Sequence, residues 1–151
     1  MSAAAPMRLT PRAAIVSWGC QLVAAGILFQ TLFYKFSGAK ESVWIFSRLG
    51  IEPWGRIGTG ALELVAAALL LIPAAIPIGA LLTSGLMVGA ILSHLGPLGI
   101  EVQGDGGLLF GLALTVLACG LLVAWLRRAS LVLMIRRANA RWSPPGSRPG
   151  A

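Results

Sequence analysis

The feature that most constrains this chain is the succession of long apolar segments that fill most of its 151 residues. Residues 13–33 and 107–126 are each apolar over about the 20 residues that a helix needs to cross a bilayer core. Residues 57–97 form a run long enough to cross twice, and Pro73 and Pro77 near its middle would interrupt a helix. We therefore expect a tight reversal at these prolines and four spans, at residues 13–33, 57–75, 78–97 and 107–126.

The composition identifies lipid as the solvent. Hydrophobic residues make up 57% of the chain and charged residues only 11%, whereas a soluble domain carries about 25% charged residues. No alternating strand pattern is present, and only helices or closed barrels satisfy their backbone groups inside a bilayer. The sequence therefore predicts an all-α integral membrane four-helix bundle over residues 1–128. A basic, partly disordered tail is expected over residues 129–151, in which the apolar piece 129–135 either prolongs the fourth helix or lies at the interface.

The net charge of +7 raises the question of nucleic acid binding, and the placement of the charges argues against it. The basic residues lie in the two tails and in one loop, not on an amphipathic face among stacking aromatic residues. The lipid bilayer is therefore the expected partner, and nucleic acid is not. The two cysteines form no CxxC motif, so neither a disulfide scaffold nor a thioredoxin-like site is indicated.

Lysine and arginine also predict the orientation, because loops on the cytoplasmic side carry more of them. Four spans place both tails on one side. The tails carry eight basic residues: Arg8, Arg12, Arg127, Arg128, Arg136, Arg137, Arg141 and Arg148. The first loop carries four: Lys35, Lys40, Arg48 and Arg56. We therefore expect both termini in the cytoplasm and the first and third loops outside.

The first outer loop contains the segment "ESVWIFSRLG", which is mostly apolar with polar ends. We interpret it as a short interfacial helix that holds Trp44 and Phe46 at headgroup level, with Trp54 in the same aromatic belt. The alternative is an ordinary loop segment on top of the bundle.

Two ionisable residues fall inside the predicted spans. Glu63 lies six residues into the second span, about 9 Å deep, and His94 lies three residues before Pro97, about 5 Å deep. An ionised carboxylate inside hydrocarbon is costly, so Glu63 should face the bundle interior. The expected partners of Glu63 are His94, Lys35 and Arg56. We expect an outer-leaflet polar cluster of Glu63 with His94, close to the turn "GDGG".

The candidate ligand-binding residues are Lys35, Glu63, His94 and Asp105. In one interpretation they are a structural clamp, with Asp105 capping the fourth helix. In a second, they line a pocket for a small polar or amphipathic molecule, such as a quinone headgroup. A metal site of His94, Glu63 and Asp105 has a chemically possible ligand set, but no close ligand spacing supports it, and we assign no metal.

Small residues on the third span suggest close helix packing. Gly85 and Gly89, with Ser93 one turn later, form a stripe of the kind that lets helices approach closely in lipid.

The stretches "YKFSGAKESVWIFSRLGIEPWGRIGTGALELVAAALLLIP" and "GALLTSGLMVGAILSHLGPLGIEVQGDGGLLF" resemble the DoxX and DoxX-like family of small bacterial membrane proteins. The resemblance covers about residues 30–126. It implies a multi-pass, four-helix protein of the bacterial inner membrane. Because the family is named after a subunit of a thiosulfate:quinone oxidoreductase, it also implies a redox- or quinone-linked membrane complex.

The function expected from these features is that of a small subunit of a membrane complex with an outer-leaflet polar pocket. The alternative is a non-catalytic scaffold or assembly factor whose polar cluster is structural. An enzyme acting by itself is the least supported interpretation, because no nucleophile–base pair is evident. No flavin or nucleotide motif is present, and a single histidine cannot supply two imidazole ligands to a haem. A quinone is therefore the one class of cofactor that we consider compatible with this sequence.

Overall fold

The structure is a computed structural model that describes residues 9–142. All of its regular elements in this range are helical, which confirms the predicted fold class. Their bounds are α1 Pro11–Ser37, α2 Lys40–Arg48, α3 Trp54–Leu71, α4 Ile76–Ser93, the π-helical turn η1 His94–Leu98, α5 Leu108–Leu126 and α6 Arg128–Trp142. The prediction of a disordered end at residues 143–151 lies outside the described residues.

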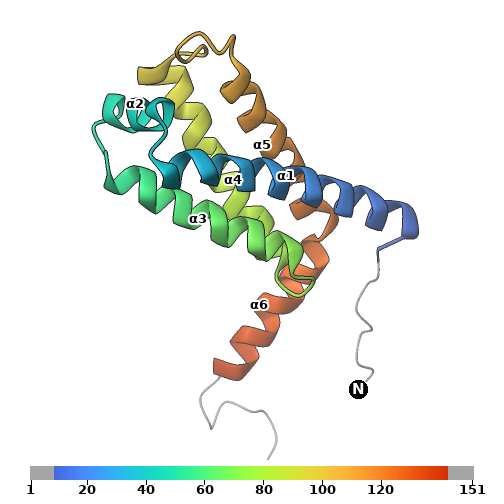
Figure 1. The fold of residues 1–151 in the computed structure, drawn as a ribbon. Coiled ribbons are helices and arrows are strands. Elements are labelled where there is room, and N and C mark those ends of the chain that lie inside the picture. The colour runs from blue at the N-terminus through green and yellow to red at the C-terminus, as the bar shows by residue number, and fades with distance from the viewer. Residues whose placement is uncertain (1–8, 143–151) are drawn as a thin grey trace, which may run out of the picture.

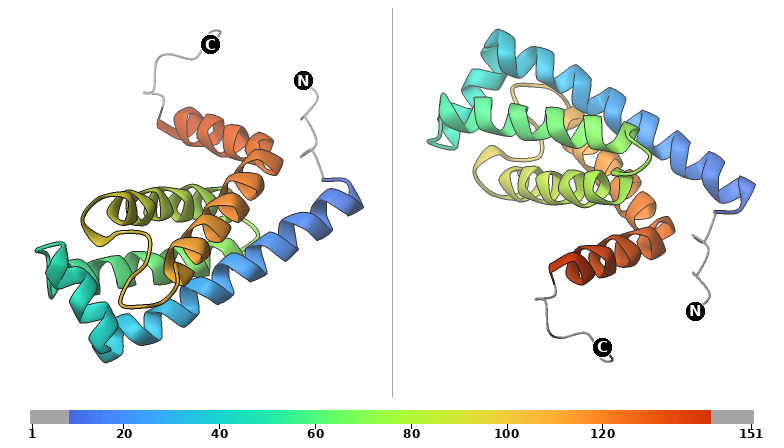
Figure 2. Two further views of the ribbon diagram at one scale, coloured as in Figure 1. Left: turned by 90° about the horizontal axis from the view of Figure 1, so that it is seen from above. Right: turned by 90° about the horizontal axis from the view of Figure 1, so that it is seen from below.

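Four of these helical segments are long and apolar enough to cross a membrane: α1, α3, α4 continued by η1, and α5. They form a ring in which α1 packs on α3, α3 on α4, α4 on α5, and α5 on α1 (Figures 1 and 2). We call the end that carries α2 and the loop of residues 99–107 the loop end. We call the opposite end, where α1 begins and α5 meets α6, the tail end.

Local sequence signals explain where α1 and the central helices begin and end. The hydroxyl of Thr10 accepts a hydrogen bond from the backbone amide of Ala13, which caps the start of α1. Gly38 ends α1 in the left-handed conformation, with φ of 68°, which favours glycine. α3 ends before Pro73, and Pro77 lies in the first turn of α4, where its missing amide hydrogen is not needed. The predicted reversal is confirmed.

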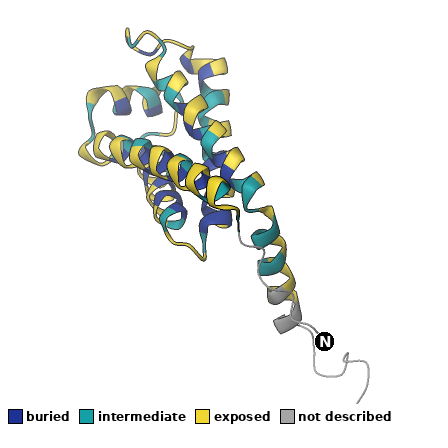
Figure 3. Ribbon diagram, turned by 90° about the vertical axis from the view of Figure 1, so that its right-hand side faces the viewer, coloured by how far each residue is buried: buried dark blue, intermediate teal, exposed yellow. Residues whose placement is uncertain are grey.

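The ring encloses a core built largely from small side chains. Its buried members include Ala24, Ala25, Leu28, Ala66, Ala67, Leu70, Ile76, Ala80, Val116 and Val123. Alanine allows neighbouring helices to approach closely, which is how helices associate in lipid. The larger apolar side chains lie mostly on the outside, where Figure 3 shows exposed residues along the helices. Small side chains inside and large apolar side chains outside are the reverse of the arrangement in a soluble protein, and they fit a bundle whose outer surface contacts hydrocarbon.

The segment after the fourth span is a separate helix. The chain leaves the helical conformation at Arg127, with φ of −101° and ψ of 12°, and α6 then projects beyond the bundle (Figures 1 and 3). Residues 129–135 therefore do not simply prolong the fourth helix, which was one of the two expected alternatives.

Helix α2 lies across the loop end of the bundle and is fixed to it. Phe46 is buried, with 7% of its surface exposed, and the Arg48 side chain donates a hydrogen bond to the carbonyl of Pro97. The predicted short helix is present, but Phe46 packs inward and does not join an outer aromatic belt. Trp54, in contrast, is 82% exposed.

Candidate functional site

A cavity of about 860 Å³ opens between the helices and includes residues of the loop end. Its wall is mostly apolar and comes from α1, α2, α4, α5 and the loop of residues 99–107, with α3 contributing two residues. All four side chains proposed from the sequence line it: Lys35, Glu63, His94 and Asp105. The structure therefore brings together residues that are up to 70 positions apart in the chain.

The ion pair between Lys35 and Glu63 is the most polar feature of the cavity wall. The Lys35 Nζ lies 2.5 Å from Glu63 Oε2, and the two side chains are only 14% and 8% exposed. The hydroxyl of Thr31 donates a second hydrogen bond, of 3.0 Å, to the same oxygen. Lys35 and Thr31 lie one turn apart on α1 and so face α3 together. Of the expected partners of Glu63, Lys35 is confirmed, and Thr31 was missed although its spacing from Lys35 could have suggested it.

His94 is buried and has a different partner from the one expected. Its Nδ1 lies 2.9 Å from the carbonyl oxygen of Gly99, and its ring packs edge-on against Phe110 with centroids 5.7 Å apart. A carbonyl oxygen only accepts, so Nδ1 carries the hydrogen and Nε2 is left as the second functional atom of the ring. No hydrogen bond joins His94 to Glu63 within residues 9–142, so the predicted direct pairing is wrong.

The position of His94 at the junction of α4 and η1 explains this difference. The chain there winds into a π-helical turn and is then kinked at Gly96. The kink brings the carbonyl of Gly99 back to the imidazole, which a regular helix would not allow. Such π turns are frequent at functional sites.

Asp105 organises the loop before α5. Its Oδ1 accepts hydrogen bonds from the amides of Val102 at 2.8 Å and Gly107 at 2.9 Å, and its Oδ2 accepts from Leu109 at 2.9 Å. Leu109 lies in the first turn of α5, so the expected capping role is present. Burial acts to raise the pKa of Asp105, but the three amide hydrogen bonds stabilise the charged form and bring this pKa below its usual value.

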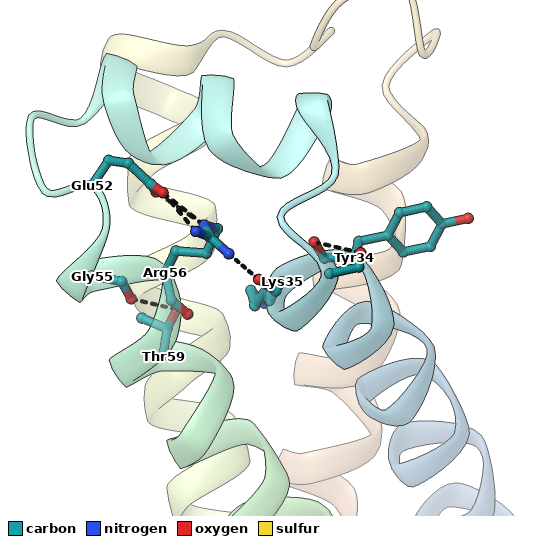
Figure 4. A network of polar contacts seen from close by, with 7 residues as sticks. Tyr34, Lys35, Glu52, Gly55, Arg56 and Thr59 are labelled. Atoms are coloured by element: carbon teal, nitrogen blue, oxygen red, sulfur yellow. Dashed lines mark hydrogen bonds and ion pairs between the residues drawn. The ribbon is translucent and has the colours of Figure 1, made fainter.

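A second network holds the rim of the loop end, and Figure 4 shows the Arg56 guanidinium between Glu52 and Lys35. Arg56 Nη2 lies 2.8 Å from Glu52 Oε1, and Arg56 Nε lies 2.9 and 3.1 Å from the two carboxylate oxygens. Arg56 Nη1 also donates to the backbone carbonyl of Lys35, in the last turn of α1. The expected pairing of Arg56 with Glu63 is therefore wrong, and the i, i+4 spacing to Glu52 was the signal that we missed.

Comparison with known proteins agrees with this architecture. The family model of the DoxX-like family matches residues 19–120. The chain belongs to the DoxX-like family. No curated protein and no solved structure matches it.

The matched range of this DoxX-like protein includes the glycines of α4, and their role differs from the expected one. A β-carbon placed on Gly85 or Gly89 would meet no atom within 4 Å, and both residues line the cavity. The stripe is therefore not a helix-packing surface. Close packing occurs at Gly79 and Gly120 instead, where an added β-carbon would lie 2.6 Å from the backbone nitrogen of Leu70 and 2.7 Å from Ser84 Oγ.

The DoxX-like bundle assembles no metal site within the described residues, since no group of three or more histidine, cysteine, aspartate or glutamate side chains comes together there. Glu63 is engaged by Lys35, and both oxygens of Asp105 accept backbone amides. The cavity wall instead offers separate donors and acceptors on an apolar surface.

Proposed function

We propose that this protein binds a small amphipathic molecule with a quinone-type headgroup in the cavity, as a small subunit of a membrane complex. The observation that carries the proposal is the shared cavity: Lys35, Glu63, His94 and Asp105 converge on one mostly apolar space. Ligand sites have volumes of roughly 300–1,000 Å³ and combine apolar walls with a few placed polar groups. The volume of about 860 Å³ lies in this range.

The polar groups suit both redox forms of such a headgroup. A quinone presents carbonyl oxygens that need donors, and the ammonium of Lys35 has three hydrogens, of which Glu63 takes one. A quinol presents hydroxyl groups that need acceptors, and Nε2 of His94 is the ring nitrogen that the Gly99 carbonyl does not occupy. The apolar wall from α4 and α5 would hold the isoprenoid side of the molecule. The link to a redox complex rests on the family resemblance alone.

A cavity-filling substitution tests this proposal. Gly89→Leu would place a side chain into the open cavity, whereas Gly19→Leu adds the same side chain where an added β-carbon also meets nothing, on an exposed position of α1. Binding of a short-chain quinone and of its quinol to the purified protein in nanodiscs gives the readout. We expect Gly89→Leu to weaken binding by about tenfold or more, or ~1.4 kcal/mol, and Gly19→Leu to leave it unchanged. Equal affinities for the two variants, or no quinone binding by the unaltered protein, would overturn the proposal.

A non-catalytic scaffold is the second candidate. It is favoured by the fact that the cluster is already satisfied internally: Glu63 is paired with Lys35, and Asp105 accepts three amides. Purification in mild detergent separates the two candidates. A quinone that copurifies supports the first, and a stoichiometric protein partner without a quinone supports the second.

We further propose that the protein lies in the bacterial inner membrane with both termini in the cytoplasm. The basis is the excess of arginine in the tails over basic residues in the first loop. Cysteines introduced at Lys40 and Glu101, in a background without Cys20 and Cys119, should react with an impermeant reagent in intact cells. Reaction only after lysis would reverse the orientation and move the cavity to the inner leaflet.

A further inference from the structure

The tail end of the bundle has an unbalanced charge. The chain has five acidic residues, and all of them lie in α2, at the middle of α3, or in the loops of the loop end: Glu41, Glu52, Glu63, Glu101 and Asp105. The described arginines of the tail end are Arg12, Arg127, Arg128 and Arg136. Both ion pairs found in residues 9–142 belong to the loop end. The described part of the protein therefore supplies no ion-pair partner for the arginines of the tail end.

Arg127 is the most constrained of these cations. It is partly buried at the joint between α5 and α6, and its Nε donates a 3.0 Å hydrogen bond to the hydroxyl of Ser17 on α1. Ser17 is fully buried and also accepts a 2.7 Å hydrogen bond from the side-chain amide of Gln21. Burial lowers the pKa of Arg127. The structure thus holds a partly desolvated guanidinium in a fixed place, with no carboxylate of residues 9–142 paired with it.

Within the described residues, the bond from Nε to Ser17 is the one side-chain hydrogen bond of Arg127, so its other two guanidinium nitrogens have no partner there. An arginine guanidinium has five N–H donors in a planar fork, which matches the oxygens of a phosphate. Its neighbour Arg128 is held as well, since its guanidinium carbon lies 4.8 Å from the centre of the Trp125 ring. Two consecutive arginines are therefore positioned at one joint.

The depth of this joint identifies the source of the phosphate. The fourth candidate span ends at Leu126, so the two arginines follow directly after the apolar segment. Trp125 is 60% exposed, as expected for an indole at the level of lipid headgroups. Beyond the joint, α6 exposes Val132 and Ile135 as well as Arg136, and it leaves the bundle (Figures 1 and 3). Basic residues border an apolar run here, as in segments that bind the surface of anionic membranes.

We propose that the α5–α6 joint is a phospholipid site, in which Arg127 and Arg128 bind the phosphate of an anionic headgroup. Ser17 positions the Arg127 guanidinium, and Trp125 packs beside the glycerol region of the same lipid. Because none of the five acidic residues lies at this end, the site should bind an anionic headgroup more tightly than a zwitterionic one, whose own cation the arginines would repel.

Nanodiscs made from mixtures of phosphatidylglycerol and phosphatidylcholine provide the test. The full chain is reconstituted, and the lipids that stay bound after mild detergent extraction are identified by native mass spectrometry. We expect retention of phosphatidylglycerol over phosphatidylcholine, and a loss of about fivefold in this preference in Arg127→Gln. Arg12→Gln is the matched control, because it removes one cation from an exposed position at the same end of the bundle.

Arg127→Gln also removes the bond to Ser17, so a second variant keeps the test decisive if it does not fold. Arg128→Gln leaves the bond between Arg127 and Ser17 in place and is expected to lower the preference by a few-fold. No preference for phosphatidylglycerol in the unaltered chain, or the same loss in Arg12→Gln as in the joint variants, would overturn the proposal and point to a protein partner or to diffuse surface charge.

Discussion

The two ends of the bundle treat their charges in opposite ways. At the loop end each strongly held cation has an acidic partner within the chain: Lys35 has Glu63, and Arg56 has Glu52. At the tail end the Arg127 guanidinium is held by a hydroxyl and has no acidic partner among residues 9–142. One end is therefore electrostatically complete by itself, and the other is complete only in the membrane. Changes at the loop end should alter stability in any medium, whereas changes at the tail end should depend on the lipid.

Removing one partner of the buried ion pair should have the largest effect. Lys35→Met leaves the Glu63 carboxylate buried with only the Thr31 hydroxyl as a partner. Breaking a buried pair in this way costs about 3–5 kcal/mol, since the remaining charge has lost its compensation. We expect a loss of this size in unfolding experiments in detergent.

The double variant Lys35→Met with Glu63→Gln serves as the control for that experiment. It should recover much of the stability, because no charge is left unpaired. Combining Glu63→Gln with His94→Ala should instead give additive losses within about 0.5 kcal/mol, because no hydrogen bond joins these two side chains within residues 9–142. A loss below 1 kcal/mol for Lys35→Met alone would contradict the pairing.

The glycines of α4 give the next largest expected difference. Gly79→Ala would place a β-carbon 2.6 Å from the backbone nitrogen of Leu70, where α3 and α4 pack near the turn that joins them. Because backbone atoms cannot move aside as a flexible side chain does, we expect a loss of about 1–3 kcal/mol. Gly89→Ala at the loop end meets open space and should be neutral or slightly stabilising. Comparable losses for the two variants would mean that the cavity is closed in the membrane.

Asp105 gives a smaller and pH-dependent effect. Its pKa is lower in the folded protein than in the unfolded chain, so its contribution is present above the unfolded pKa of about 3.9 and is lost as the pH falls through the folded value. Asp105→Asn should cost about 1 kcal/mol at pH 7, as for other helix caps, and the difference should vanish in strong acid. Thermal unfolding at a series of pH values measures this. Glu101→Gln, an exposed residue of the same loop, should follow the unaltered protein at every pH.

The smallest effect is expected for Arg128 in detergent. Arg128→Gln removes a guanidinium that lies over the Trp125 ring, a contact worth roughly 0.5–1 kcal/mol at an exposed site. Unfolding measured in a neutral detergent and again in phosphatidylglycerol nanodiscs would sharpen the contrast between the two ends. The difference in unfolding free energy between Arg128→Gln and the unaltered chain should be larger in the anionic lipid. An equal difference in both media would contradict the proposed dependence of the tail end on lipid.

The sequence predicted the framework well because the bilayer leaves so few options. Segment length and the prolines determined four spans, and the observed helices, such as α5 at Leu108–Leu126, differ from the predicted ranges by a few residues at most of their ends. The convergence of Glu63 and Lys35 could be predicted because an intramembrane carboxylate requires a partner.

Other features depended on local geometry that spacing does not show. The kink at Gly96 directs His94 to the carbonyl of Gly99, and a regular helix was assumed there. The glycines Gly85 and Gly89 fit both a helix-packing stripe and a cavity wall, and only the positions of the surrounding elements decide between them. Arg56 had two acidic residues within reach, and the nearer one in sequence, Glu52, was its partner.

The hydrogen bond between Arg127 and Ser17 has a consequence for how the protein is made. It joins residues 110 positions apart, so its acceptor enters the membrane with the first span and its donor follows the last. During synthesis the hydroxyl of Ser17 therefore lies in the bilayer without its Arg127 partner until α5 has been inserted. The hydrogen bond that Gln21 donates to Ser17, within α1 itself, satisfies part of the hydrogen-bonding capacity of this hydroxyl during that time. If the helices insert separately and then associate, the bond from Arg127 to Ser17 forms last and joins α5 to α1, which completes the ring of four helices.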